Sequence, residues 1–137
     1  MTVLADLQKL QMATRIAYQQ RQHRFQTVLA EEARLRQEIQ RLDGLDQQVR
    51  EQFLQNQNMR AIGADVLWLG WVGRSKTAVN MELSRVLAVK EHHLSEVRKA
   101  YGKRLVAEQL LDQHEKEKRQ TGAKRDLDRI IEISLFS

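Results

Sequence analysis

The segment Gly70–Thr77, which reads Gly-Trp-Val-Gly-Arg-Ser-Lys-Thr, comes closest of any stretch to a known chemical motif. It matches the phosphate-binding loop Gly-x-x-x-x-Gly-Lys-Ser/Thr, except that Ser75 stands in place of the second glycine. Such a loop needs a buried strand before it and a helix after it, so that backbone amides converge on the phosphate. No strand pattern precedes Gly70, and we therefore expect the start of a helix here and not a nucleotide site.

Metal ligands and acid–base groups are scattered along the chain. His92 and Glu96 have the i, i+4 spacing that places two ligands on one helix face, but no third or fourth ligand lies nearby in the sequence. Paired carboxylates such as Glu31-Glu32 belong to solvated helix faces, and no serine, histidine and aspartate arrangement stands out. We expect no metal, no cofactor, no small-molecule ligand and no enzymatic activity.

The composition of the 137 residues favours long helices. Proline and cysteine are absent, aromatic residues make up 5%, and helix-forming residues dominate. Lys and Arg number 23 against 18 Asp and Glu, and the two signs are interleaved, which is typical of solvated helix faces. The sequence has no signal-peptide pattern and no apolar run long enough to span a bilayer, so we expect a cytoplasmic protein.

One basic cluster keeps a nucleic-acid interpretation open. Its members are Arg98, Lys99, Lys103 and Arg104. Acids at Glu91, Glu96 and Glu108 limit the basic face, so nucleic acid is a less favoured partner. A basic coiled-coil scaffold that dimerises is the other alternative. The dependence of binding on salt concentration distinguishes the nucleic-acid interpretation from the scaffold, because binding to phosphates weakens steeply as the salt concentration rises.

The residues between about 3 and 58 show the heptad spacing of a coiled-coil helix. Every seventh residue from Leu7 forms one series: Leu7, Thr14, Arg21, Val28, Leu35, Leu42 and Val49. A companion series comprises Val3, Leu10, Ala17, Arg24, Glu31, Glu38 and Leu45, with Ile39 and Phe53 one residue beyond it. Apolar residues fill this seam best between Val28 and Phe53, and the pattern predicts a first helix over 3–58.

A turn over about 59–66 and a second helix over about 67–120 follow in this prediction. Gly63 is a helix-ending signal within the turn. Thr121-Gly122 is expected to end the second helix. A short helical turn over 126–134 is apolar enough to dock beyond it.

The predicted fold is all-α, a long antiparallel two-helix coiled-coil hairpin that forms a single domain over 1–137. The two arms have similar length, so the second would fold back along the whole of the first. With the turn near 62–66, Leu42 would lie near Val86, and Val28 would lie near Tyr101.

Both tryptophans of the chain, Trp68 and Trp71, lie in the apolar run that follows the predicted turn. Two interpretations stay open: the rings close the end of the hairpin as its last core layer, or they form a partner-binding patch, for which tryptophan is a common anchor. Insertion into a membrane interface is a third, less favoured use. Gly70 and Gly73 each weaken a helix by roughly 1 kcal/mol, which favours the partner-binding patch.

Small residues at the turn and aromatic residues just after it make up the most distinctive motif: Gly63-Ala64, then Trp68-Leu69 and Trp71. In this motif the chain resembles the FliJ-type stalk proteins of bacterial flagellar export, which are related to the stalk proteins of type III secretion. That family has small residues at its turn, followed by a Trp-Ile pair and a tyrosine. As architecture, the resemblance covers the whole chain.

The resemblance implies a non-enzymatic role in protein export. The two chain termini of the family's hairpin enter the central hole of the hexameric export ATPase, and the early part of the second helix contacts the cytoplasmic domain of the membrane export gate. Export chaperones are a further class of partner. The protein would then be cytoplasmic and peripheral to the inner membrane through these protein partners.

Two sets of residues follow from the resemblance. The gate-binding set comprises Trp68, Leu69, Trp71, Val72, Arg74, Ala78, Met81 and Arg85. The ATPase-binding set comprises Leu7, Leu10, Arg15, Arg119, Lys124 and Arg125. The family has an aromatic residue and a histidine where this chain has Arg74 and Arg85, so Trp68 and Trp71 are the alternative carriers of the gate contact.

Overall fold

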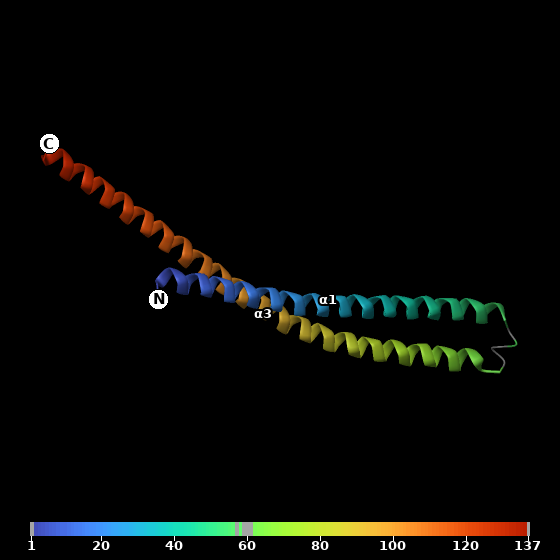
Figure 1. The fold of residues 1–137 in the computed structure, drawn as a ribbon. Helices are drawn as coiled ribbons and strands as arrows, with labels where there is room; N and C mark the ends of the chain where they lie inside the picture. The colour runs from blue at the N-terminus through green and yellow to red at the C-terminus, as the bar shows by residue number, and fades with distance from the viewer. Residues whose placement is uncertain (1, 57, 59–61, 137) are drawn as a thin grey trace. The chain divides into compact units, whose positions relative to one another are not determined.

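The computed structural model describes residues 2–56, 58 and 62–136, and it consists of two long helices packed against each other (Figure 1). Helix α1 spans Val3–Gln55 and helix α3 spans Ala64–Phe136. No strand occurs among the described residues. The predicted all-α helical hairpin is confirmed.

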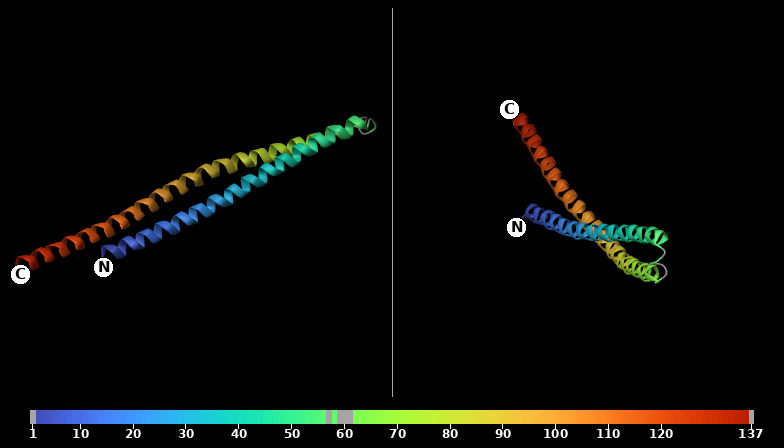
Figure 2. Two further views of the ribbon diagram at one scale, coloured as in Figure 1. Left: turned by 90° about the horizontal axis from the view of Figure 1, so that it is seen from above. Right: turned by 90° about the vertical axis from the view of Figure 1, so that its right-hand side faces the viewer.

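Contacts group the chain into two compact units. The turn unit is His23–Ser95, in which the portions of α1 and α3 lie side by side in the views of Figures 1 and 2. The terminal unit is Met1–Gln22 together with Glu96–Ser137. Each helix takes part in both units, and the single domain over 1–137 stays a prediction.

Local backbone features explain where the two helices begin. The hydroxyl oxygen of Thr2 accepts a hydrogen bond from the backbone N–H of Ala5 at 3.2 Å, which satisfies one of the free amides at the start of α1. Gly63 has a φ of +75°, a left-handed conformation that glycine adopts without steric cost. Helix α3 begins directly after it, at Ala64 and not near 67 as predicted.

Other predicted boundaries also differ from the structure. Helix α1 ends at Gln55 and not near 58, and residues 59–61 of the predicted turn lie outside the described residues. Helix α3 runs through Thr121-Gly122 without a break, so the predicted end near 120 is wrong. Residues 126–134 are helical but belong to α3. One glycine costs a helix roughly 1 kcal/mol, which a long run of good helix formers tolerates.

The core of the turn unit is a narrow apolar seam between the two helices. Leu35, Leu42 and Val49 of α1 are buried at the predicted seven-residue spacing, and Val72 and Leu83 are the buried residues of α3 in this unit. The whole predicted series is confirmed, because every seventh residue from 7 to 49 is buried or half-buried. Half-buried apolar residues such as Ile39, Phe53 and Val86 flank these buried side chains along the seam.

The predicted companion series is displaced by one residue. Val3, Leu10 and Arg24 of that series are exposed. The true companion series consists of buried and half-buried residues: Leu4, Gln11, Tyr18, Phe25, Glu32, Ile39, Asp46 and Phe53. The error has a chemical cause, since polar side chains such as Glu32 and Asp46 occupy seam positions that a search for apolar residues passes over.

Basic residues interrupt the α3 side of the seam at every second heptad. The bases Lys76, Lys90 and Arg104 alternate with Leu83, Val97 and Leu111. In the turn unit, the ammonium of Lys90 donates to Glu32 Oε1 at 2.7 Å and to Oε2 at 3.3 Å, and Glu32 is buried. The ammonium of Lys76 lies 2.6 Å from Asp43 Oδ1. A buried carboxylate is tolerated here because a cation of the other helix binds it.

The terminal unit repeats this combination of apolar and polar layers. Its buried apolar residues are Ala100, Ala107 and Leu111. The guanidinium of Arg104 lies 5.3 Å from the ring centre of Tyr18, a cation–π contact, and the rings of Tyr18 and Tyr101 are 5.6 Å apart. Tyr101 therefore lies against Tyr18 and not near Val28 as predicted.

The pairing register of the turn unit also differs from the prediction. Lys76 lies beside Asp43, the neighbour of Leu42, in the region where Val86 was expected. Val86 instead lines a hollow with Val28. The shift follows from the helix ends, because both helices border the turn at earlier residues than the sequence indicated.

The ion pair between Glu32 and Lys90 predicts a specific acid sensitivity. The hydrogen bond from Lys90 lowers the pKa of Glu32 below its ordinary value of 4.5. A carboxylate with a lowered folded-state pKa contributes stability above its unfolded pKa and loses it as the pH falls through the folded value. We expect Glu32→Gln to lower the urea midpoint near pH 7 and to flatten its fall below about pH 4.5.

Glu31→Gln is the matched control for this measurement. Arg34 on the same helix lowers the pKa of Glu31 by a hydrogen bond, but Glu31 is more exposed and does not join the two helices. Exposed pairs of this kind contribute little to stability. Equal acid profiles for Glu32→Gln and the unmodified chain would contradict a stabilising role of the Glu32–Lys90 pair.

Candidate partner-binding surfaces

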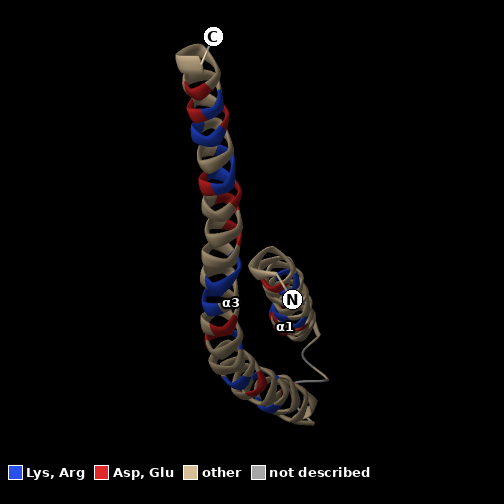
Figure 3. Cartoon of the chain, turned by 60° about the vertical axis from the view of Figure 1, so that its left-hand side comes forward, with Lys and Arg blue, Asp and Glu red and all other residues tan. Residues whose placement is uncertain are grey.

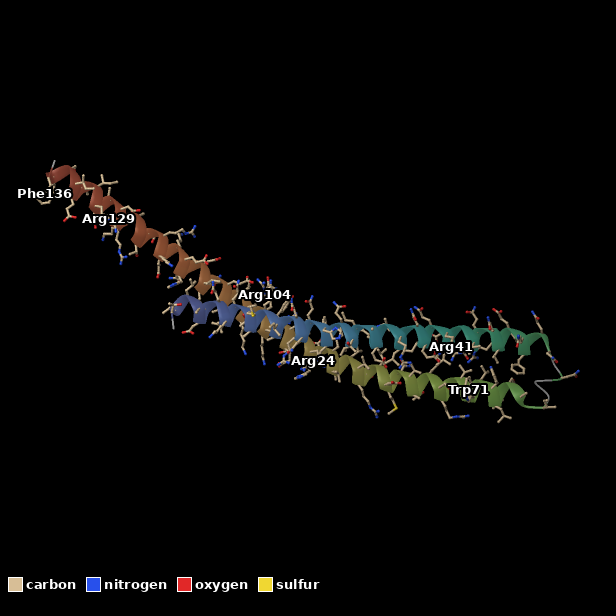
Figure 4. The ribbon with its side chains drawn as sticks, in the orientation of Figure 1. Arg24, Arg41, Trp71, Arg104, Arg129 and Phe136 are labelled. Atoms are coloured by element: carbon tan, nitrogen blue, oxygen red, sulfur yellow. The ribbon has the colours of Figure 1, made fainter. Side chains whose placement is uncertain are left out.

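Trp68 and Trp71 form an exposed aromatic pair near the start of α3. Each keeps 44% of its surface exposed, and their ring centres lie 5.4 Å apart with the planes tilted by 31°. Figure 4 labels Trp71 on its helix. The i, i+3 spacing on a helix brings the two rings together. The two rings thus lie against each other at a tilt and still leave a large apolar surface open.

Leu69 and Val72, which lie between and beside the tryptophans, are less exposed than the two rings. Val72 is completely buried and Leu69 is half-buried. Both were predicted to bind a partner, and for Val72 this is wrong, because its side chain has no exposed surface. A helix turns adjacent residues by about 100°, so Val72 can fill the seam while Trp71 stays outside it.

The predicted gate-binding stripe is exposed along its length. Arg74, Ala78, Met81 and Arg85 are all exposed. The first three line one shallow hollow together with Gly70, Gly73 and Thr77. A Cβ on Gly70 would lie 3.3 Å from Arg74 Nη1, so the guanidinium of Arg74 folds over the space that this glycine leaves. Both glycines of the tryptophan segment sit in helical backbone and open this hollow.

The residues predicted to bind the ATPase lie in the terminal unit. Leu7 is half-buried in the seam, whereas Leu10, Arg15, Arg119, Lys124 and Arg125 are exposed. Arg125 lines a hollow with Thr2, Val3 and Leu4, so it lies beside the start of α1. The structure thus brings Arg125 close to the N-terminal end and leaves Leu7 only partly accessible.

The last turns of α3 carry an exposed apolar stripe. Leu127, Ile130 and Ile131 recur at spacings of three and four and are exposed. The heptad positions that face α1 earlier in the helix continue as Arg125 and Glu132, which are charged. The apolar stripe therefore lies on a different side of α3 from the seam. The sequence predicted an apolar segment here that docks, but its pattern did not indicate that the stripe lies apart from the seam.

The basic cluster is less continuous than its sequence suggests. Arg98, Lys99 and Lys103 are exposed, but the guanidinium of Arg104 packs on Tyr18 and donates to Glu108 at 3.0 Å. Figure 3 shows acidic and basic residues interleaved along α3. The nucleic-acid interpretation thereby loses one of its four residues.

Metal ions and membranes would require other kinds of site. Within residues 2–56, 58 and 62–136, no group of three or more histidine, cysteine, aspartate or glutamate side chains is arranged to hold a metal ion, and the ring of His92 lies 5.5 Å from that of His93. No helix in the described part of the chain combines the length and the apolar character needed to cross a membrane.

Comparisons with known proteins assign no role to these candidate surfaces. No family model matches the chain, and neither the curated proteins nor the solved structures compared with it give a match. The resemblance to the FliJ-type stalk proteins therefore stays a prediction from the residues around the turn.

The contrast between Val72 and the tryptophans predicts an order of stabilities. Val72→Ala removes buried methyl groups from the seam, and we expect a loss of about 2 kcal/mol in the free energy of unfolding. Trp71→Ala, at an exposed position, should cost less despite the larger side chain. Urea denaturation followed by circular dichroism measures both. A larger loss for Trp71→Ala than for Val72→Ala would mean that the tryptophans close the hairpin.

Proposed function

We propose that the chain is a non-enzymatic coiled-coil stalk of a flagellar or type III protein export apparatus, which links a hexameric export ATPase to the cytoplasmic domain of a membrane export gate. In this proposal the protein works in the cytoplasm, peripheral to the inner membrane through its partners, and needs no cofactor. Export chaperones are further partners. The helical hairpin and the motif of Gly63-Ala64, Trp68-Leu69 and Trp71 support the proposal.

The exposure of the tryptophan pair is the observation that carries the proposal. Val72 is buried, whereas Trp68 and Trp71 each keep 44% of their surface exposed, so apolar area of both indoles remains open to a partner. Aromatic side chains that enter a pocket of a partner are typical binding hot spots. The hollow at Arg74, Ala78 and Met81 lies a few residues further along the same helix and offers a second contact.

The terminal unit supports the ATPase contact in a different way. Arg119, Lys124 and Arg125 are exposed and form no ion pair with the described residues. Helix α3 continues to Phe136, beyond the residues that line the hollow at the start of α1. Exposed cations on this part of α3 suit insertion into a central hole whose wall carries acidic groups.

A basic scaffold or nucleic-acid-binding coiled coil is the alternative. The net charge of +5 and the exposed residues Arg98, Lys99 and Lys103 favour it. Binding to nucleic acid would weaken by orders of magnitude between low and moderate salt, since it depends on counterion release. Binding of the tryptophan pair to a protein pocket would depend on salt far less.

The exposed pair predicts the effect of Trp68→Ala combined with Trp71→Ala. We expect the double variant to stay helical and to lose about 2 kcal/mol or more in its binding free energy for the cytoplasmic domain of the gate, which is the scale of hot-spot aromatic residues. Calorimetric titration measures the affinity, and circular dichroism on the same sample measures the helicity. Binding to the export ATPase should be unchanged.

Phe136→Ala is the matched control, because Phe136 is an exposed aromatic residue of the other unit. It should leave gate binding unchanged. If the folded double variant bound the gate as tightly as the unmodified chain, the tryptophans would have no part in this contact. If the unmodified chain bound neither the gate domain nor the ATPase, the proposed function would be wrong.

A further inference from the structure

A small hollow in the terminal unit is lined by residues of both helices. Ala17 of α1 and Ala100 of α3 have small side chains there, and charged residues stand around them: Arg21, Glu96, Lys99 and Lys103. The hollow has a volume of about 100 Å³. Pockets for drug-sized ligands have volumes of roughly 300–1,000 Å³, so this hollow fits only a small group.

The charges that line this hollow do not balance. Three cations, from Arg21, Lys99 and Lys103, stand against the one carboxylate of Glu96, which leaves a net charge of +2. Glu96 Oε2 lies 3.8 Å from Arg21 Nε, and Glu96 Oε1 lies 3.8 Å from Lys99 Nζ. Charge-assisted hydrogen bonds are about 2.7–2.9 Å long, so neither cation hydrogen-bonds to this carboxylate. Lys103 forms no ion pair or hydrogen bond among the described residues.

Two lysines of the turn unit are bound differently. The ammonium of Lys76 lies 2.6 Å from Asp43, and that of Lys90 lies 2.7 Å from Glu32, so each has a close carboxylate on the other helix. In the hollow of the terminal unit, two cations share one distant carboxylate and the third cation has none. The donors of this hollow are therefore available to an anion from solution.

We propose that this hollow binds a phosphoryl group, either as inorganic phosphate or as the terminal group of a phosphomonoester. A phosphoryl group carries about −1.5 to −2 charges near pH 7 and three acceptor oxygens, which match the net charge of the lining. The bound group would join Arg21 of α1 to Lys99 and Lys103 of α3, and so hold the helices of the terminal unit together. The site stands on the charges of the chain alone and does not depend on the proposed function.

Other occupants fit these charges less well. A second copy of the chain would bring the same positive lining, and like charges repel. A nucleic-acid backbone would need a longer row of free cations, but Arg104 is held by Tyr18 and Glu108. Thr14 also lines the hollow, but its hydroxyl donates to backbone oxygens of its own helix. The cations are therefore the donors for the phosphoryl oxygens.

Phosphorus NMR titration of the full chain tests the proposal, with inorganic phosphate and glycerol phosphate as probes at constant ionic strength. We expect saturable binding, and the probe that binds more tightly identifies the source of the phosphoryl group. Lys103→Gln should weaken binding by about fivefold, the scale of one exposed charge pair. Circular dichroism checks that the variant stays helical.

Lys116→Gln is the matched control, because Lys116 is an exposed lysine of the same helix and the same unit. It lies thirteen residues beyond Lys103 on α3, which is about 20 Å along the helix. Charges on the surface interact little beyond the Debye length of about 8 Å at physiological salt. The control removes the same charge from the chain and should leave phosphate binding unchanged.

Glu96→Gln gives the sharper test, because it removes the one carboxylate that repels the anion. We expect this variant to bind phosphate about fivefold more tightly, a gain that loss of structure does not produce. Unchanged or weaker binding by a helical Glu96→Gln would overturn the proposal. Equal weakening by Lys103→Gln and Lys116→Gln would overturn it too, since the effect would then come from the net charge. A DNA duplex that binds the chain while both phosphate probes fail would assign these cations to nucleic acid and overturn the proposal, as would the failure of all probes.

Discussion

The ion pair between Lys90 and Glu32 constrains how the two helices of the turn unit meet. Glu32 is buried in the seam, and the ammonium of Lys90 is its partner from the other helix, at 2.7 Å. A slide of one heptad would place Lys90 against Phe25 or Ile39 and leave both charges without a partner. An uncompensated charge in a seam is costly, so the pair favours one register over its neighbours. Asp43 and Lys76 add a second polar contact in the same unit.

This register decides which side chains are free for binding. It buries Val72 near the start of α3 and leaves the paired rings of Trp68 and Trp71 largely exposed. It also sets Val28 of α1 beside Val86 of α3, which creates an apolar hollow. A thin two-helix layer cannot cover large side chains on its outer faces, so the surfaces that remain open are those available to partners.

The sequence predicted the helical hairpin and the seven-residue series from Leu7, because absent proline, abundant helix formers and regular spacing all agree. It misplaced the companion series because polar residues such as Glu32 occupy seam positions. It misplaced the register because the signals for the helix ends near the turn are weak. The residue predicted to lie near Leu42 was Val86, whereas Lys76 lies beside Asp43. Local pattern also could not separate Val72 from Trp71, since burial at a helix end depends on which residue the opposite helix reaches.

The register of the turn unit is the central claim, and a cross-linking experiment tests it most directly. The chain has no cysteine, so an introduced pair reports without interference. Asp43→Cys with Lys76→Cys should be bridged within one chain by a thiol reagent shorter than about 15 Å, the rise of ten helical residues. Asp43→Cys with Val86→Cys should not be bridged. Efficient bridging of the second pair and none of the first would contradict the account.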